Sequence, residues 1–292
     1  MVVTAEGRFD EETQMAIKER LRHPPTSTPE EAQSHCWTLK RIQAEFAFLA
    51  DYTLSGIWHL LQRQKIRLRQ GRPQQYSPDP KYKEKEQQLL ARLTEVGQRP
   101  EQEVLIFSDE FTYHHWPLPA ATWSPLDASP PLAERADPGE EQRRIVGGVN
   151  AWQGQVTYLE AKSITGAVFG QFLRRVHQAY PEAERITVVV DNWPTHEAKA
   201  VLKVLAQLPN LELLFLPTYS PWLNPIEKLW DWLKEAVLRM HPLAGRWSAL
   251  MDEVSDFLDQ FADGSTKLLR RIGLAGDGKL AQALLTGLDA KN

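Results

Sequence analysis

The chain has 292 residues, of which 42% are hydrophobic and 25% are charged, and its formal net charge is −4. This composition is typical of a globular protein with about two domains, and the absence of a run of about 18 apolar residues argues against a membrane-spanning helix. The single cysteine, Cys36, excludes an internal disulfide and a cysteine-rich zinc site. The first residues lack the pattern of a secretory signal, so we expect a cytoplasmic protein.

Basic residues gather in the first third of the chain despite the acidic total. Residues 1–85 hold 14 Lys or Arg residues and 11 Asp or Glu residues, whereas the rest of the chain has an acidic excess. A clustered basic segment can bind phosphates whatever the global charge, although a solvated linker has a similar composition. Gly71-Arg72-Pro73 also resembles the core of an arm that enters the minor groove of DNA.

Three short helices are predicted within residues 1–85. The first covers residues 10–22, with Asp10 as its N-cap. The second begins near Trp37, and the third begins at Ser55, its expected N-cap, and buries Ile57, Leu60 and Leu61. The tight turn between the last two favours a helix-turn-helix over about residues 37–64, and an ordinary helical hairpin is the alternative. The predicted DNA-contacting residues are Ser55, Trp58, His59, Arg63, Lys65, Arg67, Arg69 and Arg72.

Strand and helix patterns alternate from residue 103 onward. Strands are predicted at 104–110, 143–152, 155–161, 185–191 and 211–217, and helices at 166–180, 196–208, 224–240 and 246–263. This order predicts an α/β domain with a mixed sheet, interrupted by a long loop at 117–142. The chain is therefore divided into a helical DNA-binding region (1–75), a linker and helix (76–102), the α/β domain (103–263) and a C-terminal tail (264–292).

Three acidic residues fall at the ends of these elements. Asp109 and Asp191 close predicted strands, and Glu227 opens a predicted helix. Ligands of open α/β sheets gather at the carboxyl ends of strands, so these acids are expected to converge. Oxygen-only ligands select Mg²⁺ or Mn²⁺, and a pair of such ions can clamp the attacking and leaving oxygens of a phosphodiester.

Each acid also has a simpler interpretation. Asp109 and Glu110 are typical of a solvated strand end, and Asp191 with Asn192 is typical of a turn. If Asn224 is an N-cap, Glu227 occupies the third helical position of a capping box.

Four further residues are candidates to support the acids. Asn192 adjoins Asp191, and His196 either approaches the acids or is exposed at a helix start. Asn224 precedes Glu227, and Trp222 is the better candidate for stacking on DNA bases. Trp230 is expected to pack in the core instead. His114 and His115 lack partners at zinc-ligand spacing.

Two stretches carry a family resemblance. The stretches VVVDNWPTH and LPTYSPWLNPIEKLW resemble bacterial transposases of the insertion-sequence six-thirty family, within the mariner-like superfamily. The upstream IFSDE resembles the first catalytic motif of these enzymes. In this chain 35 residues lie between Asp191 and Glu227, close to the spacing in the family. The resemblance covers residues 36–240.

The resemblance implies a ribonuclease H-like catalytic domain preceded by a small all-α helix-turn-helix domain. The catalytic and metal-binding residues would be Asp109, Asp191 and Glu227, with two Mg²⁺ or Mn²⁺ ions. The implied reaction is cleavage of double-stranded DNA at transposon ends, followed by transfer of the freed 3′-hydroxyl into target DNA at a TA dinucleotide. A homodimer acting at the nucleoid is expected, and no membrane is involved.

Family members usually begin with another helix-turn-helix, and few residues precede Trp37, so we expect an N-terminally short member. The alternatives are a catalytically silent or domesticated DNA-binding protein and a ribonuclease H-like nuclease with another substrate.

Overall fold

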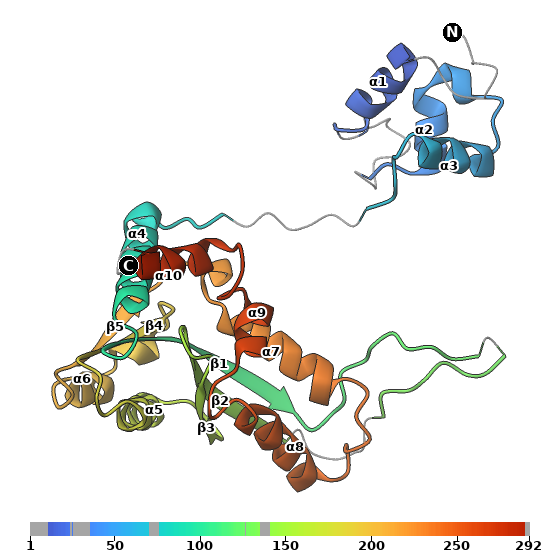
Figure 1. Cartoon of the computed structure of the whole chain (residues 1–292). Helices are drawn as coiled ribbons and strands as arrows, with labels where there is room; N and C mark the ends of the chain where they lie inside the picture. The colour runs from blue at the N-terminus through green and yellow to red at the C-terminus, as the bar shows by residue number, and fades with distance from the viewer. Residues whose placement is uncertain are drawn as a thin grey trace. The chain divides into compact units, whose positions relative to one another are not determined.

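The computed structural model describes residues 11–23, 25, 36–69, 76–125, 127–134 and 141–289. Contacts divide the chain into two units, Met1–Gln74 and Gln75–Asn292. The division falls one residue before the boundary predicted after residue 75. Figure 1 shows the elements of each unit.

The first unit is a small helical body. It contains α1 (Glu11–Arg20), α2 (Leu39–Glu45), a short 3₁₀ turn (Ala47–Leu49) and α3 (Leu54–Arg63). Its core is formed by Ile17, Ile42, Leu49, Ile57, Leu60 and Leu61. The three α3 positions predicted to face inward are therefore confirmed.

The start of α3 differs from the prediction. Thr53, and not Ser55, is the N-cap, because the Thr53 side chain accepts a hydrogen bond of 3.1 Å from the backbone N–H of Gly56. This cap satisfies an N–H group that has no partner within the helix. The predicted cap of the first helix, Asp10, lies outside the described residues.

A mixed five-stranded sheet organises the second unit. Its strands are β1 (Glu103–His114), β2 (Gln142–Asn150), β3 (Val156–Ala161), β4 (Arg185–Val190) and β5 (Leu211–Phe215), in the order β3-β2-β1-β4-β5. β1 pairs antiparallel with β2 and parallel with β4, and β4 pairs parallel with β5. The predicted mixed sheet is confirmed. β1 is longer than predicted because β2 pairs with it as far as His114.

Helices cover both faces of this sheet (Figure 1). One face packs against α5 (Gly166–Ala179) and α6 (Lys199–Leu205). The other packs against α4 (Tyr82–Gln98), α7 (Ile226–Leu233), α8 (Trp247–Asp259), α9 (Thr266–Ile272) and α10 (Lys279–Asp289).

Successive residues of β1 alternate between these two faces. Leu105 and Phe107 join the core beneath α7, whereas Val104 and Ile106 join the core beneath α5. Because side chains in a strand alternate with a period of two, the neighbours Asp109 and Glu110 are directed to opposite faces of the sheet.

Three predicted segments differ in the structure. The helix predicted at 224–240 is α7 followed by a π-helical turn, Lys234–Leu238, and the helix predicted at 196–208 is a 3₁₀ turn, Pro194–Glu197, followed by α6. The segment described above as a tail contains α9 and α10, whose Leu268 and Leu280 belong to the core beneath α7. α9 and α10 are therefore part of the folded second unit and not a tail.

The connection between β1 and β2 projects from the body of this unit as an extended arm (Figure 1). Its base is fixed by hydrogen bonds between Leu118 and the chain after α7, with Leu118 N donating to Leu238 O at 2.8 Å. Trp123 on this arm is fully exposed. Among the described residues, no helix has the length and apolar character needed to cross a membrane.

Candidate active site

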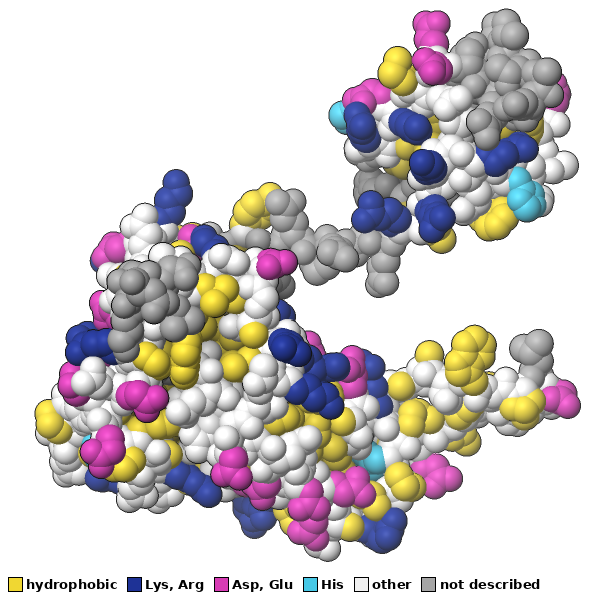
Figure 2. All heavy atoms as spheres, viewed as in Figure 1, with side chains coloured by type: hydrophobic (Ala, Val, Ile, Leu, Met, Phe, Trp, Pro, Cys, Tyr) yellow, Lys and Arg dark blue, Asp and Glu magenta, His cyan; other side chains and the backbone are white. Residues whose placement is uncertain are grey.

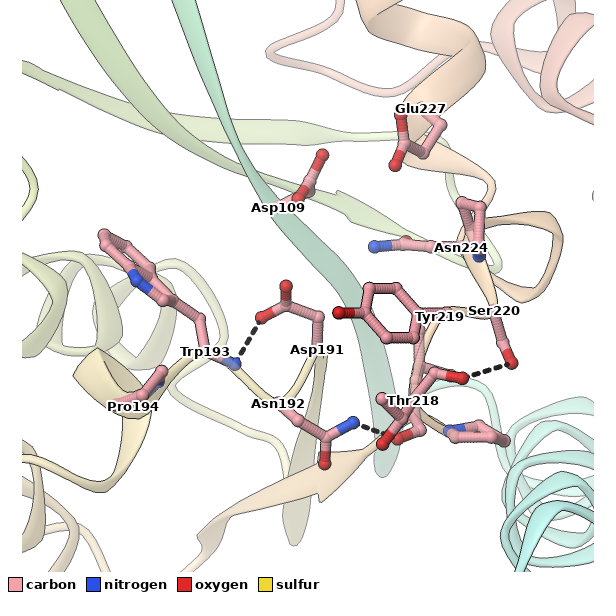
Figure 3. A pocket seen from close by; sticks show the side chains of 13 residues that line it. Asp109, Asp191, Asn192, Trp193, Pro194, Thr218, Tyr219, Ser220, Asn224 and Glu227 are labelled. Carbon is pink, nitrogen blue, oxygen red and sulfur yellow. Dashed lines mark hydrogen bonds between the residues drawn. The ribbon is translucent and has the colours of Figure 1, made fainter. Parts of the chain in front are cut away.

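The three acids singled out from the sequence line one pocket. The pocket has a volume of about 450 Å³ and lies where β4 and β5 end, beside the middle of β1. Its walls are formed by Asp109, Asp191, Asn192, Trp193, Pro194, residues 216–221, Asn224 and Glu227 (Figure 3). Residues from one strand, the segment after another strand and the start of a helix are thus brought together, as expected for the open edge of an α/β sheet.

Asp109 is held by a tryptophan from α7. The indole Nε1 of Trp230 donates a hydrogen bond of 3.0 Å to Asp109 Oδ2. Trp230 is only 2% exposed, and its ring stacks on Phe111 with a centroid distance of 5.3 Å and an interplanar angle of 12°. The predicted core position of Trp230 is confirmed, but no local sequence pattern indicates this hydrogen bond.

A glycine in β2 makes room for the indole. Gly147 pairs with Asp109 across the sheet, and a Cβ atom at Gly147 would lie 2.6 Å from the Trp230 ring. Only a residue without a side chain allows the indole to lie this close to the strand and reach the carboxylate.

Burial and negative charge act together on Asp109. Burial, followed by the charge of Glu227, raises the pKa of Asp109 from its usual 3.8 to about 7. Burial, then the charges of Asp231 and Asp191, raises the pKa of Glu227 as well. Carboxylates that disfavour one another's ionisation in this way are stabilised by a bound cation.

Asp191 is held through one of its two oxygens. Oδ1 accepts hydrogen bonds from the backbone N–H of Trp193 at 2.9 Å and from His196 Nε2 at 3.1 Å. The bond from His196 is the main cause that lowers the pKa of Asp191. Both donors bind Oδ1, and within the described residues no hydrogen bond to Oδ2 is found.

His196 is a buried residue and not an exposed one. It is 2% exposed, lies in the 3₁₀ turn after β4, and packs against the ring of Phe169 in α5 at 4.4 Å. Its Nδ1 is buried and makes no hydrogen bond within the part of the chain that the structure describes. An ionised carboxylate only accepts hydrogen bonds, so Nε2 carries the proton in the bond to Asp191.

Glu110 forms a second group with Asp191 and His196. Their ligand atoms lie within 4.8 Å of one another, and Glu110 Oε1 is 3.8 Å from His196 Nε2. Oε1 is buried and has no hydrogen bond within the described residues. Burial and the charge of Asp109 raise the pKa of Glu110 to about 8. Asp191 therefore adjoins the carboxyl groups of both Asp109 and Glu110, which β1 directs to opposite faces of the sheet.

The helix that carries Glu227 is fixed to the sheet by Asn224. α7 begins at Ile226 without a side-chain cap, so the capping-box alternative is not observed. The side-chain amide of Asn224 instead donates a hydrogen bond of 3.0 Å to the backbone carbonyl of Ser108 in β1. In Figure 3 the Glu227 carboxyl group is turned toward Asp109 and not back along its own helix.

Asn192 joins the ends of two strands at the pocket wall. Its side-chain amide donates a hydrogen bond of 2.8 Å to Leu216 O, just beyond β5. Trp222 is 43% exposed, and its contact with DNA stays a prediction. Its indole donates a hydrogen bond of 3.0 Å to the hydroxyl of Tyr82, and the residue does not line the pocket of the three acids.

The predicted DNA-contacting residues lie on the surface of the first unit. Those that the structure describes are all exposed: Ser55, Trp58, His59, Arg63, Lys65, Arg67 and Arg69. Arg72 lies outside the described residues. Figure 2 shows Lys and Arg side chains on the face of this unit that is in view. Contact of these residues with DNA phosphates stays a prediction.

Comparison with known families identifies the second unit. Residues 104–246 match the family model described as DDE superfamily endonuclease. This part of the chain belongs to the DDE endonuclease superfamily. The matched region begins in β1 and ends just before α8, so it includes all three acids of the pocket.

A bacterial relative links the chain to an insertion sequence. The Insertion element IS630 uncharacterized 39 kDa protein of Shigella sonnei is 27% identical over 156 residues, which are 53% of this chain and 44% of the relative. The expected relationship to the six-thirty family is therefore confirmed. The match spans less than half the length of that relative.

Solved structures confirm the expected ribonuclease H-like fold. The Mos1 transposase paired-end complex with left transposon end has a TM-score of 0.63 and 17% identity, covering 95% of this chain and 78% of that chain. The Mos1 mariner paired end complex with Mn has the same TM-score and identity, covering 97% and 79%. At this identity the likeness concerns the fold.

Proposed function

We propose that the protein is a DDE transposase that cleaves DNA at transposon ends and joins the freed 3′-hydroxyl to target DNA. The observation that carries this proposal is the convergence of Asp109, Asp191 and Glu227 in one pocket of a DDE-superfamily domain. The relatives named above support it, since one belongs to an insertion element and the others are transposase complexes with transposon ends.

The carboxylate oxygens that line the pocket are suitable ligands for divalent cations. Three carboxylates line it, and two of them have raised pKa values that a cation would counter. Hard oxygen ligands favour Mg²⁺ or Mn²⁺, and we propose two ions held by Asp109, Asp191 and Glu227. When bound, such ions stabilise the charge on the attacking and leaving oxygens of a phosphodiester.

The protein's own groups keep these carboxylates in place. Trp230 and His196 each donate to one oxygen of an aspartate, and Asn224 fixes the start of α7 to β1. Each carboxylate is thereby oriented before DNA binds, and such preorganisation lowers the cost of reaching the transition state.

The partner is double-stranded DNA, comprising transposon ends and a target with a TA dinucleotide. The exposed basic residues of the first unit, including Arg63 and Lys65, supply phosphate contacts. We propose a homodimer acting in the cytoplasm at the nucleoid, in line with paired-end complexes of the Mos1 proteins.

Metal-dependent nicking of a supercoiled plasmid tests the chemistry without knowledge of the recognised sequence. Wild-type protein should nick the plasmid with Mn²⁺ or Mg²⁺ and not with a chelator. Asp109→Asn, Asp191→Asn and Glu227→Gln should each abolish nicking while retaining plasmid binding in a gel-shift assay. Nicking at the wild-type rate by Asp191→Asn would overturn the mechanism.

A strand-transfer assay separates transposition from the alternatives. Labelled DNA ends taken from the flanks of the gene should become covalently joined to a target plasmid. Nicking without joining would favour a ribonuclease H-like nuclease with another substrate. Binding without nicking would favour a catalytically silent or domesticated DNA-binding protein.

A further inference from the structure

One wall of the pocket is formed by the loop of residues 216–221, and Tyr219 occupies an unusual conformation within it. Its backbone φ is +52°, in the left-handed region that residues with a Cβ atom rarely adopt. Tyr219 is also 77% exposed, so this conformation does not place the ring in a core. Figure 3 shows the ring beside the acids, with its hydroxyl end toward Asp191.

The residue before Tyr219 is held at both of its backbone polar groups. The N–H of Thr218 donates a hydrogen bond of 3.0 Å to Asp79 Oδ2, and Ser77 Oγ donates one of 2.5 Å to Thr218 O. Ser77 and Asp79 lie more than a hundred residues earlier in the chain, just before α4. We call these two contacts the Thr218 latch.

Lys85 in α4 reinforces the latch. Its Nζ lies 2.9 Å from Asp79 Oδ2 and donates to Leu216 O at 3.3 Å. Pro217 and Pro221, at either side of Tyr219, restrict their own φ angles. An unfavourable backbone conformation persists only where the surroundings fix it, and here they fix it on both sides of Tyr219.

The result is an aromatic ring that is open to solvent, is carried by a loop whose backbone is anchored at Thr218, and lines the same pocket as the carboxylates that would bind a phosphate through metal ions. Nucleobases present flat faces that stack on such rings, with little dependence on sequence. We propose that Tyr219 stacks on the base of a nucleotide adjacent to the scissile phosphate, and that the Thr218 latch holds Tyr219 in position. This inference rests on the proposed function. Tyr219 is thus a DNA-positioning residue that the sequence analysis did not single out.

The test compares removal of the ring with removal of its partner base. The strongest Mn²⁺-dependent nick made by the wild-type protein is mapped on a plasmid, and a short duplex is built around it. Tyr219→Ala should slow nicking of this duplex roughly tenfold to a hundredfold, the usual effect of losing one base–aromatic stack. An abasic site at one position beside the nick should slow the wild-type protein similarly, and the two changes combined should have no additional effect.

Conservative variants separate stacking from other roles of the residue. Tyr219→Phe should nick at nearly the wild-type rate, because stacking needs the ring and not the hydroxyl group. Tyr219→Gly should nick as slowly as Tyr219→Ala without a lower Tm, because glycine adopts the left-handed conformation freely. The matched control is Met240→Gly, which relieves a similar φ of +50° outside the pocket and should leave nicking unchanged.

The latch has its own variants. Asp79→Ala should slow nicking and add nothing in the Tyr219→Ala background, whereas Asp79→Asn should restore much of the rate because its amide oxygen can still accept from Thr218 N. If the wild-type protein nicks DNA and Tyr219→Ala matches it, or if every abasic site adds its full effect to Tyr219→Ala, the inference is wrong. Failure of the wild-type protein to nick any DNA would instead overturn the proposed function, and this inference with it.

Discussion

The indole of Trp230 in α7 donates a hydrogen bond of 3.0 Å to the carboxylate of Asp109 in β1. These residues are 121 positions apart in the chain. The bond joins the helix that carries Glu227 to the strand that carries Asp109, so two of the three acids of the pocket depend on the packing of one buried ring.

We expect Trp230→Phe to keep the fold and lose much of the nicking activity. Phenylalanine retains most of the buried ring but cannot donate to Asp109. A hydrogen bond to a charged group contributes roughly 1.5–3 kcal/mol, so the rate should fall by about 10- to 100-fold. The matched control is Trp232→Phe, since Trp232 packs on Phe257 and Phe261 away from the pocket. Equal nicking rates for the two variants would contradict the role given to Trp230.

Gly147→Ala should damage both stability and nicking. The added Cβ would meet the Trp230 ring at 2.6 Å, and overpacking of this kind costs roughly 1–3 kcal/mol. Gly148→Ala should lower the free energy of unfolding comparably, because its Cβ would meet Ile106 at 2.5 Å on the other face. Urea denaturation and plasmid nicking together distinguish them: only Gly147→Ala should lose more activity than its unfolded fraction explains. Gly245→Ala, with no atom within 4 Å, should be neutral.

The hydrogen bond from His196 to Asp191 is expected to govern metal affinity. His196→Phe removes the donor but keeps an aromatic ring in the space beside Phe169. His196→Gln retains an N–H donor in place of Nε2. Metal titration of nicking should show a higher Mn²⁺ requirement for the Phe variant, by about tenfold, and a smaller change for the Gln variant. The same Mn²⁺ requirement for both variants would show that the donor is unimportant.

The pKa values of Asp109 and Glu110 predict how the metal-free protein responds to pH. Their folded-state pKa values, about 7 and about 8, lie above their usual 3.8 and 4.5. Between these limits the folded state retains protons that the unfolded state has released, so the free energy of unfolding should decrease as pH rises from about 4 to about 8. Urea denaturation at several pH values checks this trend, and Asp109→Asn should make it shallower.

Asp79 should change the free energy of unfolding with pH in the opposite direction. The hydrogen bond from Lys85, followed by those from Thr218 and Lys81, lowers the pKa of Asp79 to about 2. Its contribution to stability is therefore complete above its usual pKa and is lost as pH falls through the lowered value. Asp79→Asn should accordingly reduce the loss of stability in acid, which would identify the latch as one acid-sensitive element.

Salt dependence should identify the basic contacts of the first unit. Arg63→Ala and Lys65→Ala are each expected to weaken DNA binding and to reduce the slope of log K against log salt by about 1, because each removes one phosphate contact. Lys18→Ala, an exposed basic residue on α1, is the matched control and should leave the slope unchanged. Unchanged slopes for Arg63→Ala and Lys65→Ala would place the DNA-binding surface elsewhere.

The sequence by itself determined the elements that depend on local periodicity. The apolar run before Asp191 is a strand buried on both faces, and the inward positions of α3 follow helical spacing. The convergence of Asp109, Asp191 and Glu227 in one pocket also agrees with the prediction, but Asp109 does not close its strand: it lies within β1, just beyond the residues that pair in parallel with β4.

Tertiary structure decided which neighbours these elements have. Asp109 and Glu110 are adjacent and chemically similar, and the period of a strand shows only that they face opposite ways. Because α7 packs on one face of the sheet, Trp230 can donate a hydrogen bond to Asp109. Because α5 packs on the other face, His196 lies in the group with Glu110 and Asp191.

The contacts made by Asn224 and Asp79 depend in the same way on long-range packing. Each binds the backbone of a residue more than a hundred positions away, Ser108 for Asn224 and Thr218 for Asp79. No local pattern predicts such a contact, because its geometry exists only after the strands have paired and the helices have packed on the sheet.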